Sequence, residues 1–225
     1  MATSRKPRGT TVERVVDELR ERIQRGEFAA GQRLIETDLT TELNVSRGPL
    51  REAFGRLAAE GLVTMEPNRG ALVRRLTRRD IEELYDVRRV LEGEAAAVAA
   101  RRIDEGDHRA RLEAALEENA RFRETVDLTS YLEHNEEFHN LIMRIAGNEL
   151  LTDLVGRFRR QALGIQLRNL VTAASSKARV SVSDSVDEHE QVAKAILAGD
   201  AELAERLMRE HVRHTGASLA ETQKP

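Results

Sequence analysis

The apolar positions at the start of the chain recur with a helical period and end at residues that stop helices. From Thr11, apolar side chains return every three or four residues, which predicts a helix closed by Gly26. The stretch AAGQR that follows is expected to form a turn. A second, shorter helix is predicted over 36–43. It ends at Asn44, because asparagine tolerates the left-handed backbone conformation.

The third predicted helix has a buried face and a separate cationic edge. It begins at Ser46, since serine is a good N-cap, and Pro49 fits the first turn. Three apolar side chains share one stripe of the helical wheel: Leu50, Phe54 and Leu57. Arg47 and Arg51 lie about 40° apart, and their centre is roughly 70° from that stripe. These arginines therefore flank the core face without belonging to it.

After the third helix the period changes from helical to alternating. In LVTMEPNRGALVRRL, Val63 and Met65 are expected to face Ala71 and Val73 across a Pro-Asn-Arg-Gly turn. This pattern predicts a β-hairpin wing with Arg69 at its tip.

The rest of the chain has only helical periodicity. Thr77 and Asp80 form a capping-box pattern that opens a long helix, and Gly106 and Gly147 interrupt the pattern further on. The expected core positions of the long helix are Leu84, Val87, Leu91, Ala95, Val98 and Ala99. We expect about six helices, over 78–104, 107–126, 129–146, 149–172, 185–198 and 201–220. The predicted fold class is mainly α, with a winged helix-turn-helix joined to an all-α antiparallel bundle.

Composition and charge divide the 225 residues in the same way. Up to residue 76 there are 14 Lys and Arg against 11 Asp and Glu, a net charge of +3; afterwards 22 face 28, a net of −6. We expect a disordered basic N-terminus over 1–10, a DNA-binding domain over 11–76 and a helical domain over 77–222.

The absence of cysteine excludes thiolate sites. No apolar run approaches the roughly 20 residues that span a bilayer, so we expect a cytoplasmic protein without a membrane partner.

The short helices suggest how the basic half could act. Two helices joined by a three-residue turn, the second opening with exposed polar and cationic groups, are typical of a helix-turn-helix in the major groove. Arginine can donate two hydrogen bonds to guanine, and a helix N-terminus offers free N–H groups to phosphate. The alternative is a generic three-helix domain with solvated arginines.

Histidines provide the candidate chemistry of the helical half. Asn135 and His139 are four residues apart and share one helix face. His189 lies 10 residues before the turn at 199–200 and His211 lies 12 after it. In an antiparallel hairpin with a rise of about 1.5 Å per residue, these two imidazoles reach nearly the same height.

Three imidazoles and an amide oxygen would suit a divalent ion such as Zn²⁺, Ni²⁺ or Mn²⁺. The alternative is that each is a hydrogen-bonded core histidine. His108, His134 and His214 lack comparable partners, and we expect them at the surface.

The segments GQRLIETDLTTELNVSRGPLREAFGRLAAEGLV and PNRGALV resemble the winged helix-turn-helix of the GntR family of bacterial transcription regulators. By this resemblance, the DNA-contacting positions are Ser46, Arg47, Arg51, Arg69 and Gly70. Thr37 stands where many relatives carry a DNA-reaching arginine. It could still bond a phosphate, with one base-reading contact fewer.

The helical half resembles the FCD ligand-binding domain of the FadR branch, and its length is similar to the VanR-type subgroup. FHNLIMRIAGN and DEHEQVAKAILAGDAELAERLMREH carry this resemblance. It implies the metal ligands Asn135, His139, His189 and His211, with a small carboxylate effector beside the metal. Asparagine replaces the aspartate of many relatives, which makes the site one charge unit more positive.

Arg88 matches a family arginine that often faces the cavity and could pair with an effector carboxylate. Glu92 lies four residues along, so an ordinary surface ion pair is an equal alternative.

We therefore predict a homodimeric, metabolite-responsive repressor that binds a pseudo-palindromic DNA operator and a small organic acid. Two alternatives remain: a dimerisation bundle whose metal only joins helices, and a metal-dependent hydrolase. The hydrolase lacks a base, because Glu136, Glu137, Glu188 and Glu190 are expected to point away from the ligands. We do not expect an enzyme.

Overall fold

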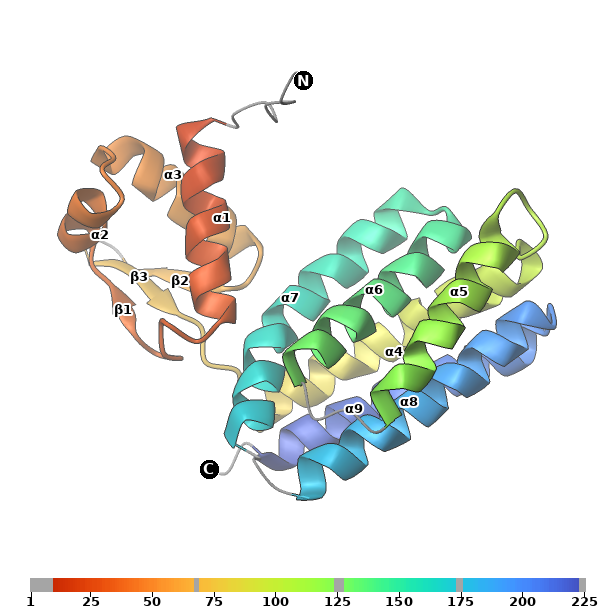
Figure 1. Cartoon of the computed structure of the whole chain (residues 1–225). Coiled ribbons are helices and arrows are strands. Elements are labelled where there is room, and N and C mark those ends of the chain that lie inside the picture. Colours follow the sequence, from red (N-terminus) through yellow and green to blue (C-terminus); the bar gives the residue numbers. More distant parts are fainter. Residues whose placement is uncertain (1–9, 67–68, 124–127, 173–175, 223–225) are drawn as a thin grey trace, which may run out of the picture. The chain divides into compact units, whose positions relative to one another are not determined.

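The computed structural model describes residues 10–66, 69–123, 128–172 and 176–222 of the chain. The parts of the predictions that lie outside the described ranges are residues 1–9 of the N-terminus, the first two residues of the wing turn and the end of the helix predicted over 107–126. Thr10, predicted as disordered, is the N-cap of α1. The chain divides into two compact units, the first formed mainly by the residues up to 75 and the second by most of the remainder. Figure 1 shows both units.

The first unit combines three helices with a small antiparallel sheet (Figure 1). Its elements are α1 (Thr11–Gln24), β1 (Arg33–Leu34), α2 (Glu36–Glu42), α3 (Arg47–Ala59), β2 (Val63–Glu66) and β3 (Gly70–Val73). The sheet order is β1-β3-β2, and Val63 pairs with Val73 and Met65 with Ala71, which confirms the predicted hairpin register. The sequence did not predict β1, because a two-residue strand is too short to show alternation.

Local signals in this unit act mostly as expected. Asn44 has a positive φ of 50° where α2 ends. Ser46 occupies the N-cap position of α3, but its side chain makes no capping hydrogen bond. The predicted apolar stripe of α3 is fully buried, with 0% exposure at Leu50, Phe54 and Leu57. A side chain of Leu, Ile or Phe gains about 1.5–3 kcal/mol when it is fully buried, so this stripe fixes the orientation of α3.

The second unit is a bundle of long helices (Figure 1). Its elements are α4 (Arg78–Arg101), α5 (His108–Ala120), the 3-10 turn η1 (Arg121–Arg123), α6 (Leu128–Ala146), α7 (Glu149–Thr172), α8 (Ser176–Leu197) and α9 (Ala201–Thr222). The predicted capping box of Thr77 and Asp80 is present at the start of α4. This helix packs against α9, α6 and α8, and so occupies a central place in the bundle.

Helix α8 begins earlier than predicted. The polar stretch SVSDSVDEHE was expected to delay the helix until residue 185, but α8 starts at Ser176 and runs through it. Val182 and Val186 lie on its buried face and pack with Tyr131 of α6. Burial of these valines outweighs the weak helix propensity of serine and aspartate.

The buried stripe of α4 also differs from the prediction. Its buried residues include Ile81, Tyr85, Arg88 and Glu92. Val87, expected in the core, is 46% exposed. Hydrophobic periodicity could not find this stripe, because two of its buried positions carry charges that neutralise each other.

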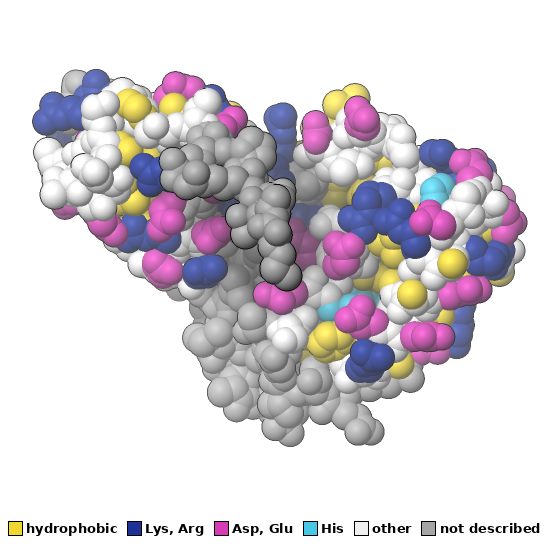
Figure 2. Space-filling model, turned by 45° about the horizontal axis from the view of Figure 1, so that its top comes forward, with side chains coloured by type: hydrophobic (Ala, Val, Ile, Leu, Met, Phe, Trp, Pro, Cys, Tyr) yellow, Lys and Arg dark blue, Asp and Glu magenta, His cyan; other side chains and the backbone are white. Residues whose placement is uncertain are grey.

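No helix in the described ranges is long and apolar enough to cross a membrane. On the face drawn in Figure 2, basic and acidic side chains are intermingled over the described surface, and hydrophobic side chains form scattered areas. Such a surface gives no clear indication of function on this face, and the interior of the bundle is more informative.

Candidate functional site

Three buried imidazoles meet inside the bundle. His139 comes from α6, His189 from α8 and His211 from α9, and each is at most 3% exposed. His211 Nε2 lies 3.2 Å from His189 Nε2 and 3.3 Å from His139 Nε2. One ligand atom from each of the three lies within 4.8 Å of the others. The prediction that His189 and His211 lie at the same height on the two helices of the α8–α9 hairpin is therefore confirmed.

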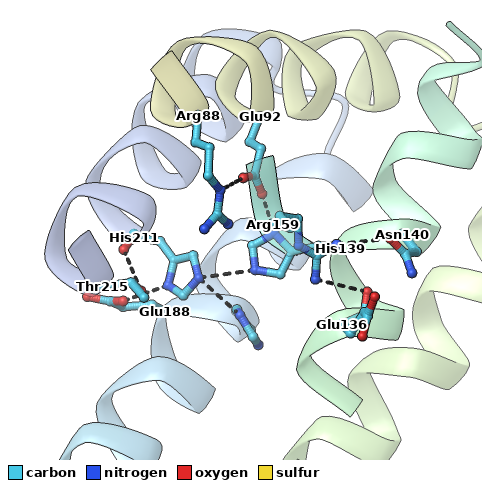
Figure 3. A network of polar contacts seen from close by, with 10 residues as sticks. Arg88, Glu92, Glu136, His139, Asn140, Arg159, Glu188, His211 and Thr215 are labelled. Atoms are coloured by element: carbon cyan, nitrogen blue, oxygen red, sulfur yellow. Dashed lines mark hydrogen bonds and ion pairs between the residues drawn. The ribbon is translucent and has the colours of Figure 1, made fainter. Parts of the chain in front are cut away.

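Carboxylates hold two of the three rings in a defined orientation (Figure 3). Glu92 Oε2 lies 2.7 Å from His139 Nδ1, and Glu188 Oε2 lies 2.8 Å from His211 Nδ1. Glu92 and His139 form a close ion-pair contact, although Glu92 Oε2 and His139 Nδ1 do not have the geometry of a hydrogen bond. The His211–Glu188 contact is a hydrogen bond, and because an ionised carboxylate can only accept, it places a proton on His211 Nδ1. This arrangement is the one that carboxylates impose on histidines that ligate metals.

The third ring is held differently. His189 stacks on Phe138 with ring centres 4.3 Å apart, and its buried Nδ1 has no hydrogen-bond partner. His211 Nε2 faces the Nε2 atoms of both His189 and His139, and in neutral rings that carry the proton on Nδ1 all three of these nitrogens are acceptors. A cation between the nitrogens would relieve this repulsion.

The donor set fits a divalent metal. Nitrogen ligands lie about 2.0–2.1 Å from a tetrahedral Zn²⁺, which places them roughly 3.3–3.4 Å from one another. The two Nε2 separations, 3.2 and 3.3 Å, are close to this value. Asn135, the predicted fourth ligand, is half-buried on α6 one turn before His139.

Burial keeps the imidazoles in the form that binds metals. It lowers the pKa of His139 to about 3, against the opposing effect of Glu92. It also lowers the pKa of His189 well below the ordinary value, and the neighbouring His211 acts in the same direction. His139 and His189 are therefore neutral at neutral pH, and neutral imidazole is the ligating form.

The carboxylates stay ionised in the same interior. Burial acts to raise the pKa of Glu92, but Arg88 and then His139 hold it well below its ordinary value. Burial likewise opposes ionisation of Glu188, and hydrogen bonds from His211 and His214 keep its pKa low. Both groups can therefore act as acceptors for ligating histidines.

Arg88 forms the predicted pair with Glu92, but not at the surface. Its Nε donates to Glu92 Oε1 at 2.7 Å, and the two side chains are 5% and 0% exposed. The guanidinium also lies over the ring of Tyr85, 4.4 Å from its centre. The ion pair is therefore internal rather than at the surface, and it holds Arg88 beside the imidazoles (Figure 3). Pairing of Arg88 with an effector carboxylate stays a prediction.

Several residues that build the site were missed or misplaced by the sequence. Glu188 was expected to point away from the ligands, yet it accepts from His211 and lies 2.6 Å from His214 Nδ1. His214 is half-exposed as expected, but it has this partner. Glu92 was considered only as a surface partner of Arg88, and its local sequence VLEGE gives no signal that the charge is buried.

His134 is a further correction. It was predicted at the surface, but only 8% of it is exposed, and its Nε2 lies 3.1 Å from Asn119 Oδ1. Its ring stacks on Phe122 with centres 4.6 Å apart. His108 is half-buried, and its Nδ1 lies 2.8 Å from the carbonyl oxygen of Arg102. Both histidines therefore have structural partners that local sequence could not show.

The predicted DNA-contacting residues of α3 lie at the surface of the first unit. Ser46 and Arg47 are exposed, and within the described ranges Arg47 forms no ion pair. The side chain of Arg51 is 59% exposed, and its Nε lies 2.8 Å from Glu36 Oε1. Glu36 orients this guanidinium and would have to share it with DNA.

The other predicted contacts come from α2 and the wing. Thr37 is exposed, and its hydroxyl donates to Asp38 Oδ1 at 3.1 Å. Arg69 is exposed at the hairpin end. Gly70 has a φ of +84°, and a Cβ there would lie 2.4 Å from the carbonyl oxygen of Leu34. Glycine is therefore needed at Gly70 for close packing of the strands.

Two protein-family models match the chain. The model "Bacterial regulatory proteins, gntR family" matches residues 11–73, and the model "FCD domain" matches residues 83–214. A relative from Paenarthrobacter nicotinovorans, named "Probable D-xylose utilization operon transcriptional repressor", is 31% identical over 212 residues, which is 94% of this chain and 90% of the relative. The Escherichia coli K12 transcriptional repressor RspR is 25% identical, over 88% of this chain and 83% of its own length.

Solved structures with the same arrangement of elements also exist. A GntR transcriptional regulator from Rhodococcus sp. RHA1 has a TM-score of 0.72 at 28% identity, covering 95% of this chain and 99% of that one. The Escherichia coli protein McbR/YncC has a TM-score of 0.78 at 22% identity, covering 96% of this chain and all of that one. The second likeness supports the fold alone.

Proposed function

Because this chain belongs to the GntR family of bacterial regulatory proteins and carries an FCD domain, we propose that it is a transcriptional repressor controlled by a small carboxylate bound at a metal in the helical bundle. The observation that carries the proposal is the meeting of three buried imidazole Nε2 atoms from three helices. Relatives named as transcriptional repressors support the direction of control.

The first unit would bind the operator. Arg47 and Arg51 stand exposed at the start of α3, where the N-terminal N–H groups favour phosphate and the guanidiniums can reach guanine. Ser46 has a hydroxyl that no cap bond occupies. Arg69 in the wing, with Thr37 on α2, would add contacts at the edge of the site, and Gly70, which is buried, would hold the wing backbone that carries Arg69. Two copies in a homodimer would read the two halves of a pseudo-palindrome.

The bundle would hold the metal and the effector. His139, His189 and His211 would ligate a divalent ion such as Zn²⁺, Ni²⁺ or Mn²⁺, with the amide oxygen of Asn135 as fourth ligand. The metal would supply a Lewis acid to which a carboxylate can bind. Arg88 would attract that carboxylate from the side of α4. The effector must bind one arrangement of the dimer better than the other in order to release or tighten DNA.

The metal ligands are tested by His189→Ala, with His108→Ala as a matched control outside the cluster. Elemental analysis is expected to find a divalent metal in the wild type and the control, and little in His189→Ala. Operator binding in a gel-shift assay should persist in all three proteins, which shows that they fold. Undiminished metal in His189→Ala would refute the ligand set.

A second measurement separates a sensor from a metal that only joins helices. Small organic acids are screened by thermal shift with and without added divalent ion. A sensor shows shifts with an acid that depend on the metal, and the same acid changes operator affinity. If the metal only joins helices, its removal costs stability and no acid has an effect.

A further inference from the structure

The imidazole cluster lies beside a second arginine, Arg159, which the sequence did not predict as a site residue. Arg159 of α7 donates from Nη1 to Asn140 Oδ1 at 2.9 Å and from Nη2 to the carbonyl oxygen of Glu136 at 3.3 Å. Its charge acts on Glu92 and on His139, and it is repelled by Arg88. Figure 3 shows Arg88 and Arg159 on the two sides of the Glu92–His139 contact.

The charges of this interior do not balance. Arg88 and Arg159 contribute two positive charges and Glu92 one negative charge, which leaves one positive charge in excess. Glu188 is at the edge of the site and shares its charge with His214. His139 and His189 are neutral and contribute nothing, and a bound divalent ion would add two more positive charges. With Glu188 fully counted, two positive charges would remain. Glu136 of α6, whose charge also favours ionised Arg159, is exposed and is not counted in this interior.

Arg159 is the group whose charge is least compensated. Both of its hydrogen bonds go to uncharged acceptors, an amide oxygen and a backbone carbonyl oxygen. These bonds use two of the five N–H groups of a guanidinium. Burial lowers the pKa of Arg159 and repulsion from Arg88 acts in the same direction, against the opposing charges of Glu92 and Glu136, so its surroundings on balance disfavour the charge. A carboxylate could relieve this cost with charge-assisted hydrogen bonds.

We infer that the effector is a dicarboxylate, with one carboxylate at the metal and the second on Arg159. This inference rests on the proposed function, because it needs a carboxylate-binding metal site. A dianion would neutralise the two positive charges that remain, whereas a monocarboxylate would leave half-buried Arg159 without an anionic hydrogen-bond partner.

The test compares acids that have the same number of carbons and differ in one carboxylate. Isothermal titration of the metal-loaded, full-length protein uses the pairs malonate and propionate, succinate and butyrate, and glutarate and valerate. At least one dicarboxylate is expected to bind about tenfold or more tightly than its partner. Equal or tighter binding of the monocarboxylates would overturn the inference and leave the proposed function intact. If no acid of either kind bound, the proposed function would fail, and this inference with it.

Variants connect the preference to Arg159. Arg159→Gln removes the charge and should reduce the dicarboxylate preference to less than about threefold, while the metal content stays unchanged. Arg159→Lys keeps the charge and should keep most of the preference. Arg157→Gln, at an exposed position on the same helix, is the matched control and should bind like the wild type. If Arg159→Gln retained its metal and the full preference, the second carboxylate would not lie on Arg159.

Discussion

The buried histidines should make the metal-free protein unstable in mild acid. His139 and His189 are neutral in the folded interior, whereas in the unfolded chain their pKa returns to about 6.5. Below that value the unfolded chain binds protons that the folded chain does not, so the free energy of unfolding falls as the pH falls. For His139 the loss continues until the pH reaches its folded pKa of about 3.

The size of the effect follows from the two pKa values. Between pH 7.0 and pH 5.5, a histidine that stays neutral in the folded state loses roughly 1.3 kcal/mol of stabilisation, and two lose roughly 2.5 kcal/mol together. For a domain stabilised by about 5–15 kcal/mol, this is a large fraction. The pKa values of Glu92 and Glu188 are lowered, so these carboxylates remain ionised in this range and do not contribute.

Urea unfolding of chelator-treated protein measures the loss directly. The midpoint should be clearly lower at pH 5.5 than at pH 7.0, with an unchanged slope. Replacing both histidines, as in His139→Gln with His189→Gln, should remove most of the pH dependence. Equal midpoints for the wild type at the two pH values would show that these imidazoles are not buried in the neutral form, and the donor geometry argued above would be wrong.

Two further predictions concern the other parts of the molecule. Arg47→Ala and Arg51→Ala should each weaken operator binding by roughly 1–3 kcal/mol in a gel-shift series, and unchanged affinity would remove these residues from the DNA interface. Glu188→Gln should weaken metal binding about 10–100-fold in a chelator competition, because His211 loses its charged acceptor, whereas Glu190→Gln should have little effect. Equal affinities for these two variants would exclude the orienting role of Glu188.

Periodicity was sufficient wherever apolar side chains alone decide the structure. The stripe of α3 and the pairing of Val63 with Val73 follow from spacing, because burial of one face fixes both the helix orientation and the strand register. The matched heights of His189 and His211 follow from helix geometry and the short turn between α8 and α9. Local sequence therefore predicted the framework of both units and the pairing of His189 with His211, whereas the resemblance to the FCD domain implied that His139 joins them.

Periodicity and helix geometry could not predict contacts between segments that are distant in the sequence. Glu92 and His139 are 47 positions apart, and only the packing of α4 against α6 brings them together. Arg159 reaches the cluster from yet another helix. Buried charges also break the hydrophobic pattern, and this explains why the stripe of α4 was assigned to Val87 rather than to Arg88 and Glu92.

The turn between α8 and α9 has an unusual constraint for a surface loop. Three residues, 198–200, connect the helices, with Gly199 at a φ of +71°. Surface loops generally accept insertions, because nothing in the interior depends on their length. Here one added residue could shift α9 along its axis by about 1.5 Å and rotate it by about 100°, which would turn His211 away from His189. The length of this loop is thus as much a part of the cluster as the imidazoles themselves.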